Sequence, residues 1–319
     1  MRTKSCSLVV LAWLLSGSWG FAVVVASDPF GNTSAPSGTG SEPTDPGFNY
    51  VGQVNGSTGV YLGNNWVLTA DHVGTGSFTL GGTTYNYNGT DSYQIGGVDL
   101  RLFKINTGPA FAPLTLATTT PSVNNDVVMI GAGRKPTSST PTTWYVDVDP
   151  NDWIWDTSTF PGWDATKAGF TTNTTKEVRW GTNVVERIVT GVKSDSYAAT
   201  DIIVTDFDET GGTAFEAQAV LNDSGSGVFV DQGSGWELAG TIVSVGNYDN
   251  QPGGNTSALF GNETYAIDLS QHAAEINGYL SPIPEWASFS LFLGGFSLLW
   301  VNRRRPGARS KTRGCRRSL

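Results

Sequence analysis

The chain has two histidines, His72 and His272, and His72 follows the acidic residue Asp71 at the end of an apolar segment. His72 stands in Thr69-Ala70-Asp71-His72-Val73, directly after the apolar segment Trp66–Leu68. An imidazole accepts and returns a proton near neutral pH, so His72 is a candidate general base. His272 falls in a segment that we expect to form a closing helix, where a surface position is the simplest interpretation.

A carboxylate and a hydroxyl occur downstream in comparable positions. Asp99 heads the apolar segment Leu100–Ile105, and Ser224 lies in Asn222-Asp223-Ser224-Gly225-Ser226, a turn before an apolar segment. A serine hydroxyl becomes a useful nucleophile when an adjacent base takes its proton and a third group orients that base. Each residue alone is ordinary turn chemistry. The order His, Asp, Ser, however, matches one known triad order and excludes two others.

The three segments together resemble the motifs of the chymotrypsin-like (trypsin fold) serine proteases. The family's Thr-Ala-Ala-His-Cys corresponds to residues 69–73, its Asp-Ile-Ala-Leu-Leu to 99–103 and its Gly-Asp-Ser-Gly-Gly to 222–226. Met129-Ile130-Gly131-Ala132-Gly133 resembles the strand that opens the family's second barrel. Leu238–Gly246 resembles the strand that follows the nucleophile and lines the substrate groove. The resemblance covers about residues 50–280.

The resemblance implies a serine endopeptidase that hydrolyses protein or peptide substrates through an acyl-enzyme, without cofactor or metal. In that family's mechanism His72 acts as general base, Asp99 orients it and Ser224 is the nucleophile. The backbone N–H groups of Asn222 and Ser224 form the oxyanion hole. Asn222 replaces a glycine of the family pattern, and asparagine tolerates left-handed backbone better than other non-glycine residues.

The same resemblance assigns the substrate-binding positions to Gln218, Ser244 and Gly246. Gln218 lies six residues before Ser224, where trypsins carry the acid that selects Arg or Lys. A neutral Gln218 argues against simple trypsin specificity, although Glu216 is near.

Three nearby polar residues leave alternatives open. Asp71 replaces a small residue beside His72, and its charge is expected to favour the protonated imidazole. Asp91 is an alternative orienting acid and Ser226 an alternative nucleophile, but neither has the neighbours of its motif. The acidic segment Asp147–Ser158 begins like a calcium loop but lacks the glycine and the final glutamate of an EF-hand, so a solvated loop is expected.

The elements that must position these groups are strands. The chain of 319 residues is 39% hydrophobic and 15% charged and contains 40 glycines, a composition unlike that of a helical bundle or a disordered chain. Apolar stretches of strand length, separated by Gly and Asn turns, predict a barrel or sandwich. One helix is expected, over residues 268–280, with Asp268 and Gln271 placed as a capping box.

With the resemblance, the fold class becomes all-β. It comprises two antiparallel six-stranded barrels, over residues 48–120 and 121–281, of which the second includes the closing helix. The strands expected outside the motifs lie at 60–62, 66–68, 78–80, 83–85, 100–105, 127–130, 144–148, 184–192, 202–206, 227–230, 236–245 and 264–269.

Both ends of the chain are interpreted as targeting segments. Arg2, Lys4 and the apolar run Leu8–Leu15 predict a secretory signal peptide over residues 1–26, with Val24-Val25-Ala26 as the cleavage tripeptide. Residues 27–47, rich in Ser, Thr, Gly and Pro, are expected to be a flexible linker. Cys6 lies in the signal peptide and Cys315 in the tail, so the processed body has no cysteine.

The C-terminal end reads Pro282-Ile283-Pro284-Glu285-Trp286, then an apolar run to Val301, then Arg303-Arg304-Arg305. This order resembles the PEP-CTERM sorting signal of Gram-negative bacteria. It implies a transmembrane anchor over residues 282–305, a basic tail over 306–319 and processing by an exosortase-type enzyme after signal peptidase. The expected location is the bacterial cell envelope or surface, with release as a further possibility. A plain membrane anchor is the alternative.

The distribution of charge argues against a nucleic acid as a partner. The net charge is −9, and ten of the 19 Lys and Arg residues lie within the first four residues or after Val301, so the body is strongly acidic. A nucleic acid is therefore not an expected partner. Two other functions stay open beside the peptidase: a catalytically inactive protease fold that binds at the surface, and a structural or adhesive β-rich surface protein.

Overall fold

The structure, a computed structural model, describes residues 23–149, 152–194 and 196–281. The expected sorting signal, the basic tail and most of the signal peptide lie outside these residues. The chain divides into two units, Met1–Leu280 and Ser281–Leu319, and all described elements belong to the first. Within the described ranges, no helix has the length and hydrophobicity needed to cross a bilayer.

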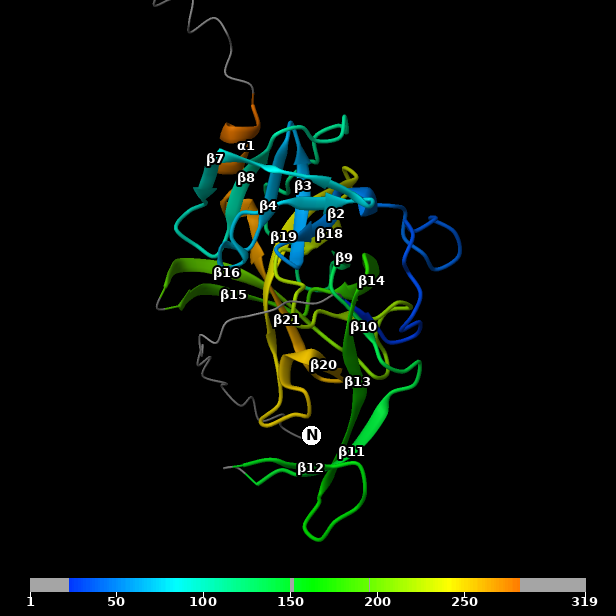
Figure 1. The fold of residues 1–319 in the computed structure, drawn as a ribbon. Helices are drawn as coiled ribbons and strands as arrows, with labels where there is room; N and C mark the ends of the chain where they lie inside the picture. The colour runs from blue at the N-terminus through cyan, green and yellow to red at the C-terminus, as the bar shows by residue number, and fades with distance from the viewer. Residues whose placement is uncertain (1–22, 150–151, 195, 282–319) are drawn as a thin grey trace, which may run out of the picture. The chain divides into compact units, whose positions relative to one another are not determined.

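The first large sheet is antiparallel and contains seven strands in the order β6-β5-β2-β3-β4-β8-β7 (Figure 1). Asn64 and Asn65 turn the β3–β4 hairpin with φ of 51° and 68°, and Gly81 and Gly82 turn β5–β6 with φ of 55° and 79°. Left-handed backbone at the turn matches the twist of the flanking strands. The strands are β2 (Val51–Val54), β3 (Ser57–Gly63), β4 (Trp66–Thr69), β5 (Phe78–Leu80), β6 (Thr83–Tyr85), β7 (Tyr87–Gln94) and β8 (Arg101–Ile105).

The second large sheet is also antiparallel, with the order β14-β9-β18-β19-β21-β16-β15. Its strands are β9 (Asp126–Gly131), β14 (Arg179–Val184), β15 (Arg187–Ser194), β16 (Tyr197–Asp206), β18 (Gly227–Asp231), β19 (Trp236–Gly246) and β21 (Glu263–Asp268).

Two smaller sheets complete the fold. One has five strands, β10 (Arg134–Pro136), β11 (Thr142–Asp147), β12 (Ile154–Asp156), β13 (Ala165–Lys176) and β20 (Ser257–Leu259). In Figure 1, β11 and β12 lie at the end away from α1 and β7. The other pairs β1 (Val24–Val25) with β17 (Ala217–Gln218).

The expected number of strands per barrel, six, is wrong for both large sheets. In the first, β7 joins as a seventh strand beside β8. In the second, the strand expected at residues 184–192 is β15, which pairs with β16, and β14, which ends at Val184 and pairs with β9, is an additional strand. The other expected strands are present, with ends that shift by a few residues.

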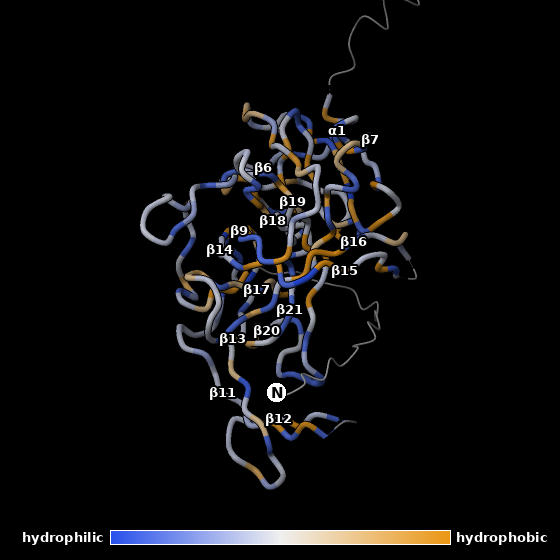
Figure 2. The backbone as a smooth tube through the Cα atoms, turned by 180° about the vertical axis from the view of Figure 1, so that it is seen from behind, coloured by the Kyte–Doolittle hydropathy of each residue, from blue (hydrophilic) through white to orange (hydrophobic). Residues whose placement is uncertain are grey.

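The largest hydrophobic core draws on both large sheets. It includes Leu68 and Leu102 of the first sheet together with Ile130 and Phe229 of the second. Figure 2 shows the hydrophobic segments gathered around β9, β16, β18 and β19. Burial of apolar side chains contributes about 25 cal/mol per Å². Both sheets therefore depend on one shared core, which holds their loops in a fixed arrangement.

The expected closing helix is shorter than predicted. A 3₁₀ turn, η4 (Leu269–Gln271), precedes the α-helix α1 (Ala273–Leu280). The Asp268 side chain accepts a hydrogen bond from the Ser270 N–H at 2.9 Å, as a capping residue should. Gln271 does not return the bond of a capping box, because its amide donates to Asp201 Oδ2 at 2.6 Å.

The segment expected to be a flexible linker, residues 27–47, makes defined contacts with the second sheet. Asn32 exchanges hydrogen bonds with the Trp180 backbone, and the Trp180 indole donates to the Ser34 carbonyl at 2.9 Å. Ser37 and Thr44 form a β-bridge, and the Trp236 indole donates to Thr44 Oγ1.

Candidate active site

Strand pairing in the first sheet brings His72 and Asp99 together. Thr69, at the end of β4, pairs with Arg101, at the start of antiparallel β8. The chain leaving β4 and the chain entering β8 therefore lie at the same end of the sheet. His72 follows within a short 3₁₀ turn, η2 (Asp71–Val73).

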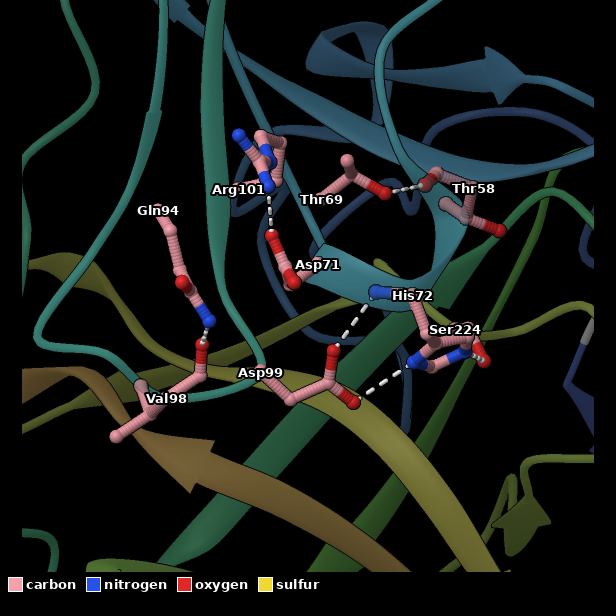
Figure 3. A network of polar contacts seen from close by, with 9 residues as sticks. All are labelled: Thr58, Thr69, Asp71, His72, Gln94, Val98, Asp99, Arg101 and Ser224. Atoms are coloured by element: carbon pink, nitrogen blue, oxygen red, sulfur yellow. Dashed lines mark hydrogen bonds and ion pairs between the residues drawn. The ribbon is translucent and has the colours of Figure 1, made fainter. Parts of the chain in front are cut away.

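Both carboxylate oxygens of Asp99 are used by His72 (Figure 3). The His72 backbone N–H donates to Oδ1 at 2.9 Å, and His72 Nδ1 lies 2.7 Å from Oδ2. Asp99 is 4% exposed, so its charge is shielded from water. This arrangement favours the tautomer with hydrogen on Nδ1 and leaves Nε2 free to accept a proton.

Ser224 lies on the other side of the imidazole. Its Oγ is 2.8 Å from His72 Nε2. The turn that carries it is closed by hydrogen bonds from the Asp223 N–H to the Val220 carbonyl and from the Ser226 N–H to the Asp223 carbonyl. Sequence analysis therefore identified three groups that form one hydrogen-bonded chain, Asp99–His72–Ser224.

Thr58 of β3 fixes the turn around Ser224 from the first sheet. Its N–H donates to the Ser224 carbonyl at 3.1 Å, and its hydroxyl donates to the Asn222 carbonyl at 3.0 Å. The same hydroxyl accepts from the Ala132 N–H at 3.0 Å. Sequence analysis missed Thr58, because nothing local distinguishes it from any strand threonine.

Gly225 allows the turn that carries Ser224 to lie close to β3. Its φ is 91°, and a Cβ built there would lie 2.0 Å from the Thr58 carbonyl oxygen and 2.3 Å from Thr69 Oγ1. Any side chain would push Ser224 away from β3. The Gly in Ser224-Gly225 is thus required by space and by backbone conformation together.

Asn222 adopts the left-handed backbone that its position was expected to need, with φ of 84°. Its side chain is buried and donates weakly to Ser57 Oγ at 3.3 Å. Within the described part of the chain, neither the Asn222 N–H nor the Ser224 N–H donates a hydrogen bond to a protein group. Two backbone donors beside Ser224 Oγ are therefore available to a ligand.

The alternative site residues are engaged elsewhere. Ser226 is fully buried, and its hydroxyl donates to Asp223 Oδ1 at 3.3 Å. Burial raises the pKa of Asp223 well above its usual range. Asp91 accepts from Asn88 Nδ2 at 2.7 Å within β7. Neither alternative reaches His72 in this structure, where Ser224 and Asp99 hold its two ring nitrogens.

Asp71, beside His72, is neutralised by a partner that sequence analysis did not identify. Its carboxylate forms an ion pair with Arg101 (Figure 3). The other terminal nitrogen of Arg101 donates to Ser92 Oγ at 3.2 Å. Tyr197, at the start of β16, interacts with both Asp71 and Asp99. Burial and these two carboxylates raise its pKa strongly, so Tyr197 remains a neutral hydrogen-bond donor.

The expected substrate-binding residues lie on two strands, β17 and β19. Gln218 on β17 is 1% exposed, and neither atom of its amide has a hydrogen-bond partner. Ser244 and Gly246, at the end of β19, are partly exposed. Glu216 is held internally by Asn183 and Thr213, and burial raises its pKa to about 7.

The aromatic side chains of residues 142–163 pack against one another and against the segment that contains Tyr248. Trp153 stacks on Tyr248 at 5.4 Å between ring centroids, and the Trp155 indole donates to the Asp249 carbonyl at 2.9 Å. Asp156 accepts from the Ser158 N–H and hydroxyl. Within the described residues, no cluster of His, Cys, Asp and Glu has the arrangement of a metal site.

Comparison with solved structures finds matches at low sequence identity. A protease from M. tuberculosis, Rv3671c in its active form, aligns with a TM-score of 0.39 and 11% identity, covering 81% of each chain. Neuropsin, a serine protease expressed in the limbic system of mouse brain, aligns with a TM-score of 0.44 and 14% identity, covering 79% of this chain and 99% of its own. No curated protein sequence matches the chain.

The family comparison covers most of the body. The family model described as Trypsin matches residues 37–265, which include the first large sheet, the second large sheet as far as Tyr265 in β21, and His72, Asp99 and Ser224. This match confirms the resemblance to trypsin-fold serine proteases. The chain belongs to the trypsin family.

Proposed function

We propose that this protein is an exported serine endopeptidase in which Ser224, His72 and Asp99 form the catalytic triad. The observation that carries the proposal is the continuous hydrogen-bonded chain, 2.7 Å from Asp99 to His72 and 2.8 Å from His72 to Ser224. The substrate is a protein or peptide, as expected for a member of this family.

The geometry supports a simple route for the proton. His72 Nε2 takes the proton from Ser224 Oγ as the oxygen attacks the scissile carbonyl carbon. Asp99 holds the ring and stabilises the imidazolium that forms. His72 then gives the proton to the leaving amine, and an acyl-enzyme remains on Ser224. Water, deprotonated by the same His72, hydrolyses the ester and restores the serine.

The oxyanion of the tetrahedral intermediate is assigned to the N–H groups of Asn222 and Ser224. Both are unengaged by protein groups of the described chain, and Asn222 has the positive φ that the loop requires. Thr58 anchors this turn through the carbonyls of the same two residues. The Asp223 carbonyl, which shares its peptide group with the Ser224 N–H, is held by the Ser226 N–H. One preorganised donor of this kind is worth about 2.7–4 kcal/mol of transition-state stabilisation.

Substrate selection is assigned to Gln218 and to the end of β19. An unpaired, buried amide at Gln218 disfavours a charged side chain in the primary pocket, because neither amide atom neutralises it. Ser244 and Gly246 would present backbone groups to an extended peptide, in the manner of an added strand.

The sequence supports a location outside the cytoplasm. The N-terminal leader directs export through signal peptidase. Residues 282–305, which resemble a PEP-CTERM signal, would hold the protein in the membrane until an exosortase-type enzyme processes them. The Arg cluster after Val301 would keep that end on the cytoplasmic side. The proposed location is therefore the bacterial envelope or surface.

Active-site labelling tests the catalytic proposal. A fluorophosphonate should label Ser224, because only a base-activated hydroxyl reacts rapidly. Ser224→Ala should lose labelling and peptidase activity by roughly 10³-fold or more while the thermal unfolding curve stays close to that of the parent. His72→Ala should have the same effect on labelling.

Other labelling outcomes would contradict the assignment. Labelling that survives in Ser224→Ala and disappears in Ser226→Ala would move the nucleophile to Ser226. A folded parent protein that takes up no label and cleaves no member of a peptide library would favour the inactive surface-binding protein instead. The library profile of the active protein would also reveal which side chain fits against Gln218.

A further inference from the structure

The first described residues belong to the folded body rather than to a leader. Val23, Val24 and Val25 are each 0% exposed. Val23 and Val25 pack in the core cluster that contains Val127, Met129 and Ala217. Val24 packs on the opposite side, in the cluster that contains Phe170, Phe207 and Val220. The alternation of burial toward two clusters is that of a strand covered on both faces.

Backbone hydrogen bonds attach the same segment to the wall of the candidate site. β1 pairs antiparallel with β17, placing Val24 opposite Gln218 and Val25 opposite Ala217. The Ala26 N–H donates to the Glu216 carbonyl at 2.8 Å, and the Ser27 hydroxyl donates to the Ala214 carbonyl at 2.8 Å. β17 lies six residues before Ser224, so β1 supports the strand that leads into the nucleophile turn.

The next residues continue the attachment through a buried guanidinium. Arg179 is 0% exposed and donates from Nε to the Gly31 carbonyl at 2.9 Å and from Nη2 to the Asp28 carbonyl at 2.8 Å. A buried charge without such acceptors is costly. The segment from Val23 to Gly31 is thus attached to the rest of the body at both ends of the segment.

Cleavage after Ala26, the site predicted from sequence, would remove β1 from this fold. Three fully buried valines would be lost, and the outer edge of β17 would be left without its partner. A second tripeptide with small first and third residues, Gly20-Phe21-Ala22, lies four residues upstream. It follows the apolar run Leu8–Leu15 at a distance compatible with a signal-peptide cleavage region.

We propose that the leader is removed by hydrolysis of the Ala22–Val23 bond, so that the exported protein begins at Val23 and retains β1. One water is consumed, Ala22 acquires the carboxylate and Val23 the amine. The enzyme is the cell's signal peptidase, acting on the exported precursor.

The proposal rests on the export proposed above, but its readout is independent of peptidase activity. The full-length precursor is expressed in a Gram-negative host, and the N-terminus of the exported protein is determined by peptide mass mapping. The expected N-terminal peptide begins at Val23. An N-terminal peptide that begins at Ser27, lacking three valines and one alanine, would overturn the proposal. So would a start upstream of Val23 or an exported protein that keeps residues 1–22.

Matched substitutions identify the scissile bond without relying on mass alone. Ala22→Val places a branched side chain where a small one is needed, and the precursor should accumulate at least tenfold over the parent. Ala26→Val makes the same change at the other candidate bond and should be processed as the parent is. The reverse pattern would assign the cleavage to Ala26.

A second pair tests whether β1 is part of the fold. Val24→Asp puts a charge into the buried strand and should lower the Tm by roughly 10 °C or prevent export of folded protein. Val123→Asp makes the same change at a residue that is 49% exposed and should leave the Tm within about 2 °C. Equal Tm values for the two variants would show that β1 is dispensable and would contradict the proposal.

Discussion

The carboxylate of Asp71 forms an ion pair with Arg101 directly beside the candidate catalytic histidine. Asp71 precedes His72 by one residue, and Arg101 follows Asp99 by two. The pair therefore places one negative and one positive charge close to the imidazole, and their effects on its protonation oppose one another. The triad carboxylate is left as the uncompensated charge that faces His72.

Removing Arg101 and removing Asp71 should shift the pH dependence of kcat/KM in opposite directions. Arg101→Gln leaves Asp71 unpaired, favours the imidazolium and should move the acidic limb of kcat/KM up by roughly half a pH unit. Asp71→Asn leaves Arg101 unpaired and should move it down by a similar amount. The pH–rate profiles of both single variants and the double variant form the test.

The double variant serves as the control for this charge effect. With both charges gone, its acidic limb should return to within about 0.2 pH unit of the parent, as expected for charges that cancel. Shifts in the same direction in both single variants would mean that they act through the structure of η2 rather than through charge.

The Thr58 hydroxyl should matter for catalysis although it touches no substrate. Thr58→Val keeps the shape but leaves the Asn222 carbonyl and the buried Ala132 N–H without their partner. The free energy of unfolding should fall by about 1–3 kcal/mol, and kcat should fall with little change in KM, because the turn that presents the Asn222 and Ser224 N–H groups loses an anchor at the Asn222 carbonyl. Thr58→Ser keeps the hydroxyl and should retain most of the activity. Equal kcat values for the Val and Ser variants would show that the Thr58 hydroxyl does not contribute to catalysis.

His272 should make the stability of the body depend on pH. Burial lowers the pKa of His272, against the opposing charges of Glu275 and Asp268, and its Nε2 lies 3.1 Å from Thr200 Oγ1. The unfolded chain therefore binds a proton at higher pH than the folded chain does. Stability from the neutral ring is complete above about pH 6.5 and is lost as the pH falls through the lowered pKa.

The measurement for His272 is the Tm between pH 8 and pH 5. The parent should lose stability over the acidic part of this range by about 1.4 kcal/mol for each unit by which the pKa is lowered. His272→Gln cannot titrate and should show a shallower slope. Parallel slopes would indicate that other groups control the acid sensitivity.

The sequence predicted those parts of the site and fold that have a local signature. His72, Asp99 and Ser224 could be identified because each stands in a short motif beside an apolar strand. The hairpins at Gly81-Gly82 and Asn64-Asn65 were predicted because left-handed turns need those residue types. β7 was missed because Tyr87–Gln94 lacks buried alternation.

Long-range contacts carry the remaining information, and the sequence pattern does not contain them. Thr58 meets the Ser224 turn across more than 160 residues, and Arg101 is one of many basic residues until Asp71 is placed next to it. Val23 and the two valines of β1 have the same apolar character in a leader as in a buried strand. Only their pairing with β17 distinguishes the two.

The body should not need the residues that follow Ser281. Helix α1 ends at Leu280, which is 8% exposed, and the Leu280 carbonyl accepts a hydrogen bond from Asn64 Nδ2 at 3.0 Å. The last helix turn is thus attached to the β3–β4 hairpin, and α1 already covers the core beneath it.

A stop codon after Ser281 should give a folded protein, with unchanged fluorophosphonate labelling, that leaves the envelope for the medium. Replacing Arg303, Arg304 and Arg305 by Glu in the full chain should weaken envelope retention without changing the labelling, since in the proposed topology the positive charges would hold that end in the cytoplasm. Cell fractionation with labelling of each fraction measures both effects. A truncated protein that fails to fold would mean that residues 282–319 belong to the catalytic body, and the sorting-signal interpretation would then be abandoned.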